Sequence, residues 1–167
     1  MPEAFALFVG GNFYANRVGI AWYARHVAAD SPVPVVVVGR GFESLRGSLE
    51  IPGKLQVVGA VDNLQEWYER AQFVIAPIFD GSGMKTKVAE ALMFGKKVVG
   101  TPEAFSGYEG VAGEAGWLCR NAVEFVQAMR TASRTIVSRF SPASRDIYSR
   151  LYSSAAAERR LRSILED

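Results

Sequence analysis

A short glycine-rich turn followed by two lysines and a glutamate is the part of this chain best suited to bind a ligand. The segment reads FDGSGMKTKVAEALMFG over residues 79–95. A helix that begins near Met84 or Lys85 would direct its unpaired amides at a ligand, and such helix starts bind anions. The residues before it have small side chains or none, so the backbone can approach closely; they are Gly81, Ser82 and Gly83. The segment therefore predicts an anion site.

Three charged side chains refine that prediction. Lys85 and Lys87 add positive charge, whereas Glu90, farther along the helix, accepts hydrogen bonds from sugar hydroxyls and repels phosphate. A ligand that carries both phosphate and a vicinal diol, such as a nucleoside diphosphate, satisfies all three. The alternative is an ordinary surface ion pair between Lys87 and Glu90, which would gain only about 0.2–0.5 kcal/mol.

Other phosphate-binding patterns are absent from the sequence. The first strand ends without GxGxxG, because Phe13 and Tyr14 stand where glycines belong, so we expect no nicotinamide site. No segment has a glycine, four residues and then Gly-Lys-Ser/Thr, which excludes a P-loop. Arg17 follows the polar loop 12–16 and opens the first helix. Its guanidinium can reach phosphate oxygens at the strand ends, or it is a solvated helix-terminal arginine.

Composition narrows the class of protein further. With 49% hydrophobic and 22% charged residues among 167, the chain is expected to fold as one soluble globular domain. The net charge of +2 leaves no broad basic face, so we expect no nucleic-acid partner. Cys119 and His26 are single residues of their kinds, which argues against a disulfide, a thiolate cluster and a histidine-based metal site. We expect no cofactor and no requirement for a metal ion. No leader-like start and no apolar run of about 20 residues is present, which favours a cytoplasmic protein.

Short apolar runs alternate with helical segments, which predicts an α/β fold of the Rossmann-like, doubly wound type. Its parallel sheet should have about six strands, with helices on both faces. The predicted strands are Phe5–Val9, Val33–Val38, Leu55–Val58, Phe73–Ala76, Lys97–Gly100 and Gly116–Cys119. Ligands of such sheets bind beyond the carboxyl ends of the strands. Residues expected at that edge are Gly10, Gly11, Gly39, Arg40, Gly59, residues 80–84 and Thr101.

Helix boundaries and domain limits follow from local signals. Asp62 precedes one predicted helix, Asn121 with Glu124 begins another, and Ser141 with a following proline begins the last. We expect a Rossmann-like domain over residues 1–140. A single long helical extension over residues 141–167 should then pack on the domain, extend away from it or reach toward a second domain.

Five landmarks, in order along the chain, give a resemblance to a known family. They are FVGG with its NxxxNR loop, VVVVGRG, VVGAVDNLQEWYERAQFVIAPI, GSGMKTKVAEALMFGKKVV and GEAGWLC. Almost end to end, the chain resembles the nucleotide-sugar-binding, carboxyl-terminal half of GT-B-fold glycosyltransferases. The family is the large retaining one that includes many bacterial polysaccharide and lipopolysaccharide enzymes. The branch with GSG, a lysine and an EA pair is more similar than the branch with EGFG.

The resemblance implies roles for individual residues. In that family the loop and helix hold the diphosphate of an activated sugar, which implies phosphate contacts for Ser82, Gly83, Met84 and Lys87. Glu90 matches the glutamate that takes the ribose hydroxyls. The segments that match those lining the base are Gly39, Arg40 and the residues from Val61 to Leu64.

The chain also departs from the family pattern. That pattern has two glutamates separated by seven residues, and counting back from Glu90 puts Ser82 at the first, where an acid normally contacts the transferred sugar. Asp80 is the nearby carboxylate that could substitute, so Ser82 and Asp80 are the donor-side catalytic candidates. Gly11 stands where the family often has arginine, and Arg17 where it often has a phosphate-binding lysine.

The resemblance predicts a donor-binding domain that holds a nucleoside diphosphate sugar for transfer to a glycan, a lipid or another acceptor. A GT-B enzyme works in a cleft between two domains, and this chain supplies one. We therefore expect it to be a truncated part of a two-domain parent, inactive alone, whose missing amino-terminal domain is its partner. Peripheral membrane association through the parent is a further expectation. The alternatives are a non-catalytic nucleotide-sugar-binding or regulatory module, and a flavodoxin-like or sugar-epimerase-like domain.

Overall fold

A parallel sheet lies at the centre of the molecule, seen here in a computed structural model that describes residues 2–81 and 86–165. In this part of the chain six strands pair in the order β3-β2-β1-β4-β5-β6, and every neighbouring pair is parallel. The strands are β1 Ala6–Val9, β2 Val35–Val38, β3 Leu55–Gly59, β4 Phe73–Ala76, β5 Val98–Gly100 and β6 Gly116–Leu118.

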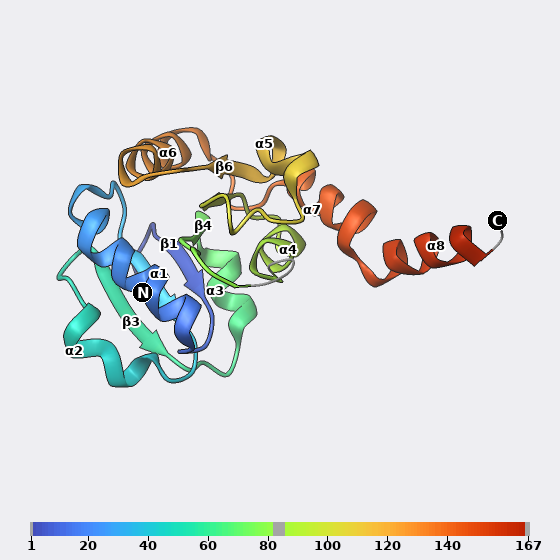
Figure 1. Cartoon of the computed structure of the whole chain (residues 1–167). Coiled ribbons are helices and arrows are strands. Elements are labelled where there is room, and N and C mark those ends of the chain that lie inside the picture. Colours follow the sequence, from blue (N-terminus) through green and yellow to red (C-terminus); the bar gives the residue numbers. More distant parts are fainter. Residues whose placement is uncertain (1, 82–85, 166–167) are drawn as a thin grey trace.

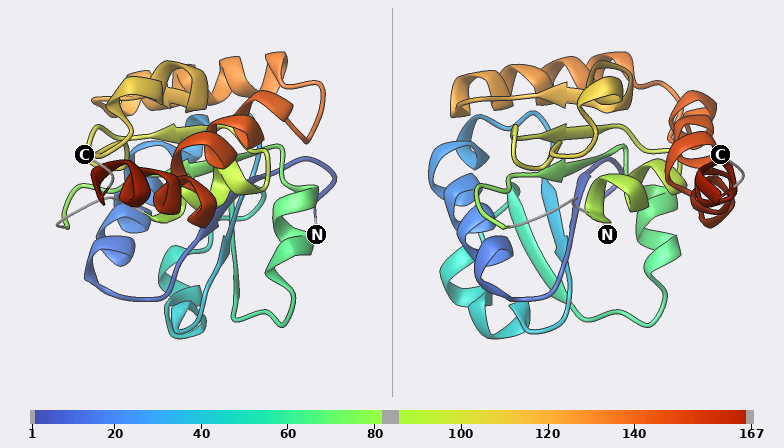
Figure 2. Two further views of the ribbon diagram at one scale, coloured as in Figure 1. Left: turned by 90° about the vertical axis from the view of Figure 1, so that its right-hand side faces the viewer. Right: turned by 45° about the vertical axis from the view of Figure 1, so that its right-hand side comes forward.

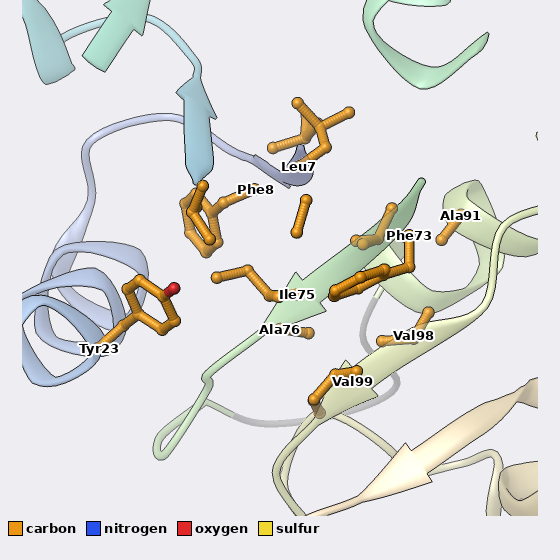
Figure 3. Packing of buried hydrophobic residues seen from close by; sticks show 14 of the residues in the cluster. Leu7, Phe8, Tyr23, Phe73, Ile75, Ala76, Ala91, Val98 and Val99 are labelled. Atoms are coloured by element: carbon orange, nitrogen blue, oxygen red, sulfur yellow. The ribbon is translucent and has the colours of Figure 1, made fainter. Parts of the chain in front are cut away.

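The apolar strands are covered on both faces. Every residue of β1, β2 and β4 is buried, as expected for runs of apolar residues without alternation. Figure 3 shows the packing around β4: Tyr23 approaches from one side of the sheet and Ala91 from the other. Each fully buried large apolar side chain contributes roughly 1.5–3 kcal/mol, so this two-sided core holds the strand ends in fixed positions.

The helices form two layers (Figure 1). On one face α1 and α6 meet through Trp22 and Phe125, whose ring centroids are 5.7 Å apart. On the other face Tyr68 of α3 stacks on Phe94, the residue that follows α4, with ring centroids 4.4 Å apart. The helices are α1 Tyr14–His26, α2 Arg46–Leu49, α3 Leu64–Arg70, α4 Thr86–Met93, α5 Ala112–Ala115, α6 Ala122–Thr135, α7 Pro142–Ile147 and α8 Ser154–Leu165.

The predicted α/β fold class, with a doubly wound parallel sheet and helices on both faces, is confirmed. All six predicted strands are present, with ends that differ by no more than two residues. The strand order excludes the flavodoxin-like alternative, whose order is 2-1-3-4-5.

Some helix boundaries match the prediction and others do not. Asn121 accepts from the amide of Glu124 at 2.9 Å, and Ser141 accepts from the amide of Ser144 at 3.2 Å, so both predicted caps are confirmed. At α3 the capping position is Asn63 rather than Asp62, without a side-chain cap bond. α1 begins at Tyr14, which places residues predicted as a loop inside the helix.

The single long helix predicted over residues 141–167 is wrong, because the chain breaks at Ser153. Its amide closes a π-helical turn, Tyr148–Tyr152, by donating to Tyr148 O at 2.9 Å, and its backbone is extended. Its hydroxyl then accepts from the amide of Ala156 at 3.2 Å, which starts α8. In Figures 1 and 2, α7 lies beside α4, and α8 projects away from the sheet. The predicted domain limit at residue 140 stays a prediction.

A buried lysine joins α3 to the start of this tail. The ammonium of Lys96, only 2% exposed, donates to Ala71 O at 2.8 Å, to Glu69 O at 3.3 Å and to the carbonyl of Arg139. Burial lowers the pKa of Lys96 to about 8, with the charge of Arg139 acting in the same direction. Lys96 therefore fixes the point from which the tail departs.

A membrane-spanning helix must be both long and strongly apolar. None of the helices in the described part of the chain meets both requirements.

Candidate functional site

The carboxyl edge of β1, β2 and β3 is tied together by backbone hydrogen bonds. The amide of Gly10 donates to Val38 O at 3.0 Å, and the amide of Gly39 donates to Gly59 O at 2.7 Å. A side chain on Gly39 would place its Cβ 1.8 Å from Gly10 O, so only glycine permits this approach. The structure thus brings the predicted residues of the first two strand ends side by side.

Lys87, on the first turn of α4, reaches across to the end of β1. Its ammonium donates to the carbonyl of Val9 and lies 4.9 Å from the centre of the Phe8 ring. A Cβ on Gly10 would lie 2.2 Å from the same ammonium, so Gly10 leaves the space that Lys87 occupies. The alternative to a ligand site was a surface ion pair between Lys87 and Glu90. Among the described residues this ammonium forms no such ion pair.

Burial changes the acid–base behaviour of Lys87. Desolvation lowers the pKa of its ammonium to about 8, and the charge of Glu90 opposes that shift. A desolvated ammonium binds an incoming anion strongly, because water screens the attraction less. Lys87 is therefore suited to hold a phosphate at the end of β1.

Glu90 lies one turn along α4 and is half-buried. Its carboxylate is close enough to the Tyr68 hydroxyl of α3 for its charge to act on that group. Lys87 and Glu90 are three positions apart on one helix, and they direct a cation toward β1 and a carboxylate toward α3. Together they can hold a ligand that presents an anion and a pair of hydroxyls about one helical turn apart.

Four of the predicted site residues lie outside the described residues: Ser82, Gly83, Met84 and Lys85. Asp80 and Gly81 precede them on an exposed loop, where the Asp80 carboxylate accepts from the Gly81 amide at 2.7 Å. The roles predicted for all six stay predictions.

The remaining predicted residues are spread around the same edge. Arg17 and Arg40 are exposed, and within the described residues no side-chain hydrogen bond or ion pair holds Arg17. Val61 and Leu64 are half-buried against the core where β3 leads into α3. A Cβ on Gly11 would meet nothing closer than Arg40 O at 3.8 Å, so a larger side chain fits there.

Two polar residues that shape this edge were missed in the sequence. Asn16 is buried, and its side-chain amide donates to Gly11 O at 2.8 Å, which fixes the turn after β1. Glu43 accepts from the amides of Gly41 and Ala60, both at 2.6 Å, and so joins the ends of β2 and β3. These bonds, that to Ala60 foremost, lower the pKa of Glu43. Asn16 belongs to the NxxxNR landmark and could have been identified, whereas Glu43 has no local signal.

Thr101, at the end of β5, supports the loop that leads to the glycine-rich segment. Its hydroxyl donates to the carbonyl of Ile78 and accepts from the Ile78 amide at 3.2 Å. The predicted position of Thr101 at the carboxyl edge is therefore correct. Its contacts make it a support for the backbone after β4.

A separate hollow of about 680 Å³ lies at the amino ends of β2 and β3, next to Pro34 and Gly53. Its polar groups are already used, because Lys54 donates to Ser31 O and Arg46 donates to Val57 O. Lys87 and the glycines of the candidate site lie at the opposite ends of these strands.

Among the described residues no group of three or more His, Cys, Asp or Glu side chains could hold a metal ion.

Comparison with known proteins gives the chain a family. A family model described as "Glycosyl transferases group 1" matches residues 4–134. No curated protein sequence matches the chain. Because the family match covers most of the chain, it shows that the chain is related to this family and does not only share its fold.

Solved structures give the same fold. One similar structure is sucrose-phosphate synthase from Thermosynechococcus elongatus, with 18% identity and a TM-score of 0.76 over 99% of this chain and 46% of that one. Anabaena HepE in complex with UDP has 14% identity and a TM-score of 0.73 over 98% of this chain and 49% of that one. WaaG, a glycosyltransferase involved in lipopolysaccharide biosynthesis, has 16% identity and a TM-score of 0.66 over 95% and 46%. The chain spans about half the length of these proteins, and its fold is that of the carboxyl-terminal half of a GT-B glycosyltransferase.

Proposed function

This chain belongs to the glycosyl transferases group 1 family, and from that premise we propose that it binds the nucleoside diphosphate sugar donor of a glycosyl transfer reaction. The observation that carries the proposal is the placement of Lys87 and Glu90. One turn of α4 presents an ammonium at the end of β1 and a carboxylate toward α3. A diphosphate and the ribose diol next to it carry the two complementary groups.

The chemistry of the donor half is to bind the diphosphate and to stabilise it as it leaves. Negative charge develops on the diphosphate as its bond to the sugar breaks, and a cation already in place stabilises that charge. Lys87 supplies the cation, and the amino-terminal end of α4 adds about 0.3–1 kcal/mol for an exposed anion and more for a buried one. Lys85 and Arg17 are proposed to add further charge. The scheme requires no metal ion and no cofactor.

Other residues of the edge are proposed to complete the donor site. The backbone of Gly10 and Gly39 gives the ligand close access, and Arg40, Val61 and Leu64 line the base. Ser82, Gly83 and Met84 are proposed to contact phosphate, with Ser82 or Asp80 near the transferred sugar.

The acceptor and the second half of the cleft are proposed to come from an amino-terminal domain of a longer parent protein. Support comes from the similar structures, of which the chain covers about half. The two HepE structures contain UDP and UDP-glucose, which supports a nucleotide sugar as ligand. We propose a cytoplasmic parent that contacts a membrane through its other parts, and a chain that transfers no sugar alone.

A second candidate function is a non-catalytic nucleotide-sugar-binding module. Gly11 favours it. The family often has an arginine at this position, and a Cβ would have room here, yet the chain has no side chain with which to bind the donor. The two functions predict the same binding by this chain. They differ in the parent protein, where nucleotide-sugar binding without sugar transfer or donor hydrolysis would favour the module.

Two variants test the assignment of phosphate and diol. Lys87→Met and Glu90→Ala would each be titrated with a nucleoside diphosphate, the parent nucleoside and inorganic pyrophosphate. We expect Lys87→Met to weaken binding of both phosphate ligands, and Glu90→Ala to weaken the nucleoside diphosphate but not pyrophosphate. Equal losses for both variants on every ligand would contradict the division of roles.

A further inference from the structure

Tyr68 is fixed against the helix that carries Glu90. It belongs to α3 and is fully buried, and its ring stacks on Phe94 with centroids 4.4 Å apart and ring planes at 11°. Phe94 lies one turn after Glu90, and its amide donates to Glu90 O at 3.1 Å. The Tyr68 side chain therefore lies beside the end of α4, on the side that Glu90 shares with Phe94, the residue that follows the helix.

The Tyr68 hydroxyl is buried, and within the described residues it makes no hydrogen bond of ordinary geometry. Buried hydroxyls are nearly always hydrogen-bonded, because a lost partner is not replaced by water. A buried phenol that is held rigidly without a partner is unfavourable for folding alone. Its hydroxyl is available for a group that turns toward it.

The Glu90 carboxylate is the group beside it. Burial is the main cause that raises the pKa of Tyr68, and the charge of Glu90 with its acceptor oxygens raises it further. A small rotation of the carboxylate would complete the bond, since Glu90 is only half-buried and retains side-chain freedom.

We propose that Tyr68 is a positioning residue whose hydroxyl donates to the Glu90 carboxylate and orients it for a vicinal diol. The inference rests on the proposed donor-binding function. A carboxylate has about four acceptor sites on two oxygens, so one bond from Tyr68 leaves room for both ribose hydroxyls. Tyr68 limits the rotamers of Glu90 before the ligand arrives, which lowers the entropy lost on binding.

Tyr23 offers a matched control for the removal of the hydroxyl. It is also fully buried, and its hydroxyl also makes no hydrogen bond of ordinary geometry among the described residues. It lies in α1 on the other face of the sheet. Tyr68→Phe and Tyr23→Phe therefore remove equivalent atoms, and only the first removes one beside Glu90.

The experiment compares a nucleoside diphosphate with its 2′-deoxy form, by calorimetric titration of the folded chain. We expect the unchanged chain to bind the ribose form more tightly than the 2′-deoxy form. In Tyr68→Phe the ratio of the two dissociation constants should shrink roughly fivefold, as for residues in one hydrogen-bond network. Pyrophosphate binding should not change, and Tyr23→Phe should behave as the unchanged chain. In a Glu90→Ala background, Tyr68→Phe should have no further effect.

The outcomes separate the inference from the function on which it rests. If the unchanged chain binds no nucleoside diphosphate, the proposed function fails. If it binds and Tyr68→Phe keeps the full ribose preference, the positioning role is overturned while the function stands. Phe94→Leu is a second variant, which removes the stack that fixes Tyr68 and should also reduce the preference. An unchanged preference in that variant would likewise count against the inference.

Discussion

The affinity of this chain for a nucleoside diphosphate should fall about tenfold between pH 7 and pH 9, because the cation proposed to bind phosphate is a half-buried lysine. Lys87 lies at the end of β1 with its ammonium on the Val9 carbonyl. Burial lowers its pKa to about 8, against the opposing effect of Glu90. The ammonium, which is the form proposed to bind phosphate, is therefore lost between pH 7 and pH 9.

The magnitude follows from the fraction of Lys87 that is charged. With a pKa of about 8, the ammonium is roughly 90% populated at pH 7 and roughly 10% at pH 9. An apparent dissociation constant rises in inverse proportion to the competent fraction, which gives the tenfold change. A bound diphosphate stabilises the ammonium, so binding near pH 8 should take up protons.

Calorimetric titration at pH 7, 8 and 9, in two buffers with different ionisation enthalpies, measures both effects. Lys87→Met should bind more weakly at pH 7 and lose the pH dependence. Lys97→Met is the matched control, since Lys97 lies at the amino end of β5 against Trp117, away from the site. An unchanged affinity from pH 7 to pH 9, or the same pH dependence in Lys87→Met, would refute the role of Lys87.

Three further substitutions test the structure of the edge and of the tail. Gly39→Ala should destabilise the fold by about 1–3 kcal/mol in denaturant titration, because its Cβ would overlap Gly10 O, whereas Gly47→Ala, with nothing within 4 Å, should not. Lys96→Met leaves three buried carbonyls without their donor and should remove about 2 kcal/mol of stability, or roughly 4–8 °C in Tm by calorimetry; a Tm within 1 °C of the unchanged chain would contradict it. Gly11→Arg should fit and tighten diphosphate binding about tenfold by adding a charged donor; weaker binding in a folded variant would show that the space is needed by the ligand.

Much of the fold could be predicted because its signals are local. Val35–Val38 is a run of four valines, and such an apolar, β-branched run without alternation predicts a strand that is covered on both faces. Asn121 and Ser141 cap their helices through bonds to residues three positions away, so a short window of sequence contains both partners. The order of the strands was not part of the prediction, and it comes from the pairing alone.

The geometry of the site depends on contacts that no local pattern contains. Lys87 and Val9 are 78 positions apart, whereas Glu90 is three positions from Lys87 on the same helix, so only the second contact lies within a short window of sequence. The bridge from Glu43 to Ala60 and the stack of Tyr68 on Phe94 join segments distant in sequence. The break at Ser153 was missed because a serine inside a helical pattern also reads as an exposed helix position.

Titration of the purified chain with UDP, GDP, ADP and their sugar conjugates, followed by amide NMR shifts, tests the central claim most directly. We predict saturable binding to at least one of them, with shifts in Gly10, Gly39 and the first turn of α4. The amino-end hollow at Pro34 and Gly53 should be unaffected. No saturable binding to any of them, or shifts confined to that hollow, would contradict the assignment of this chain as a donor-binding domain.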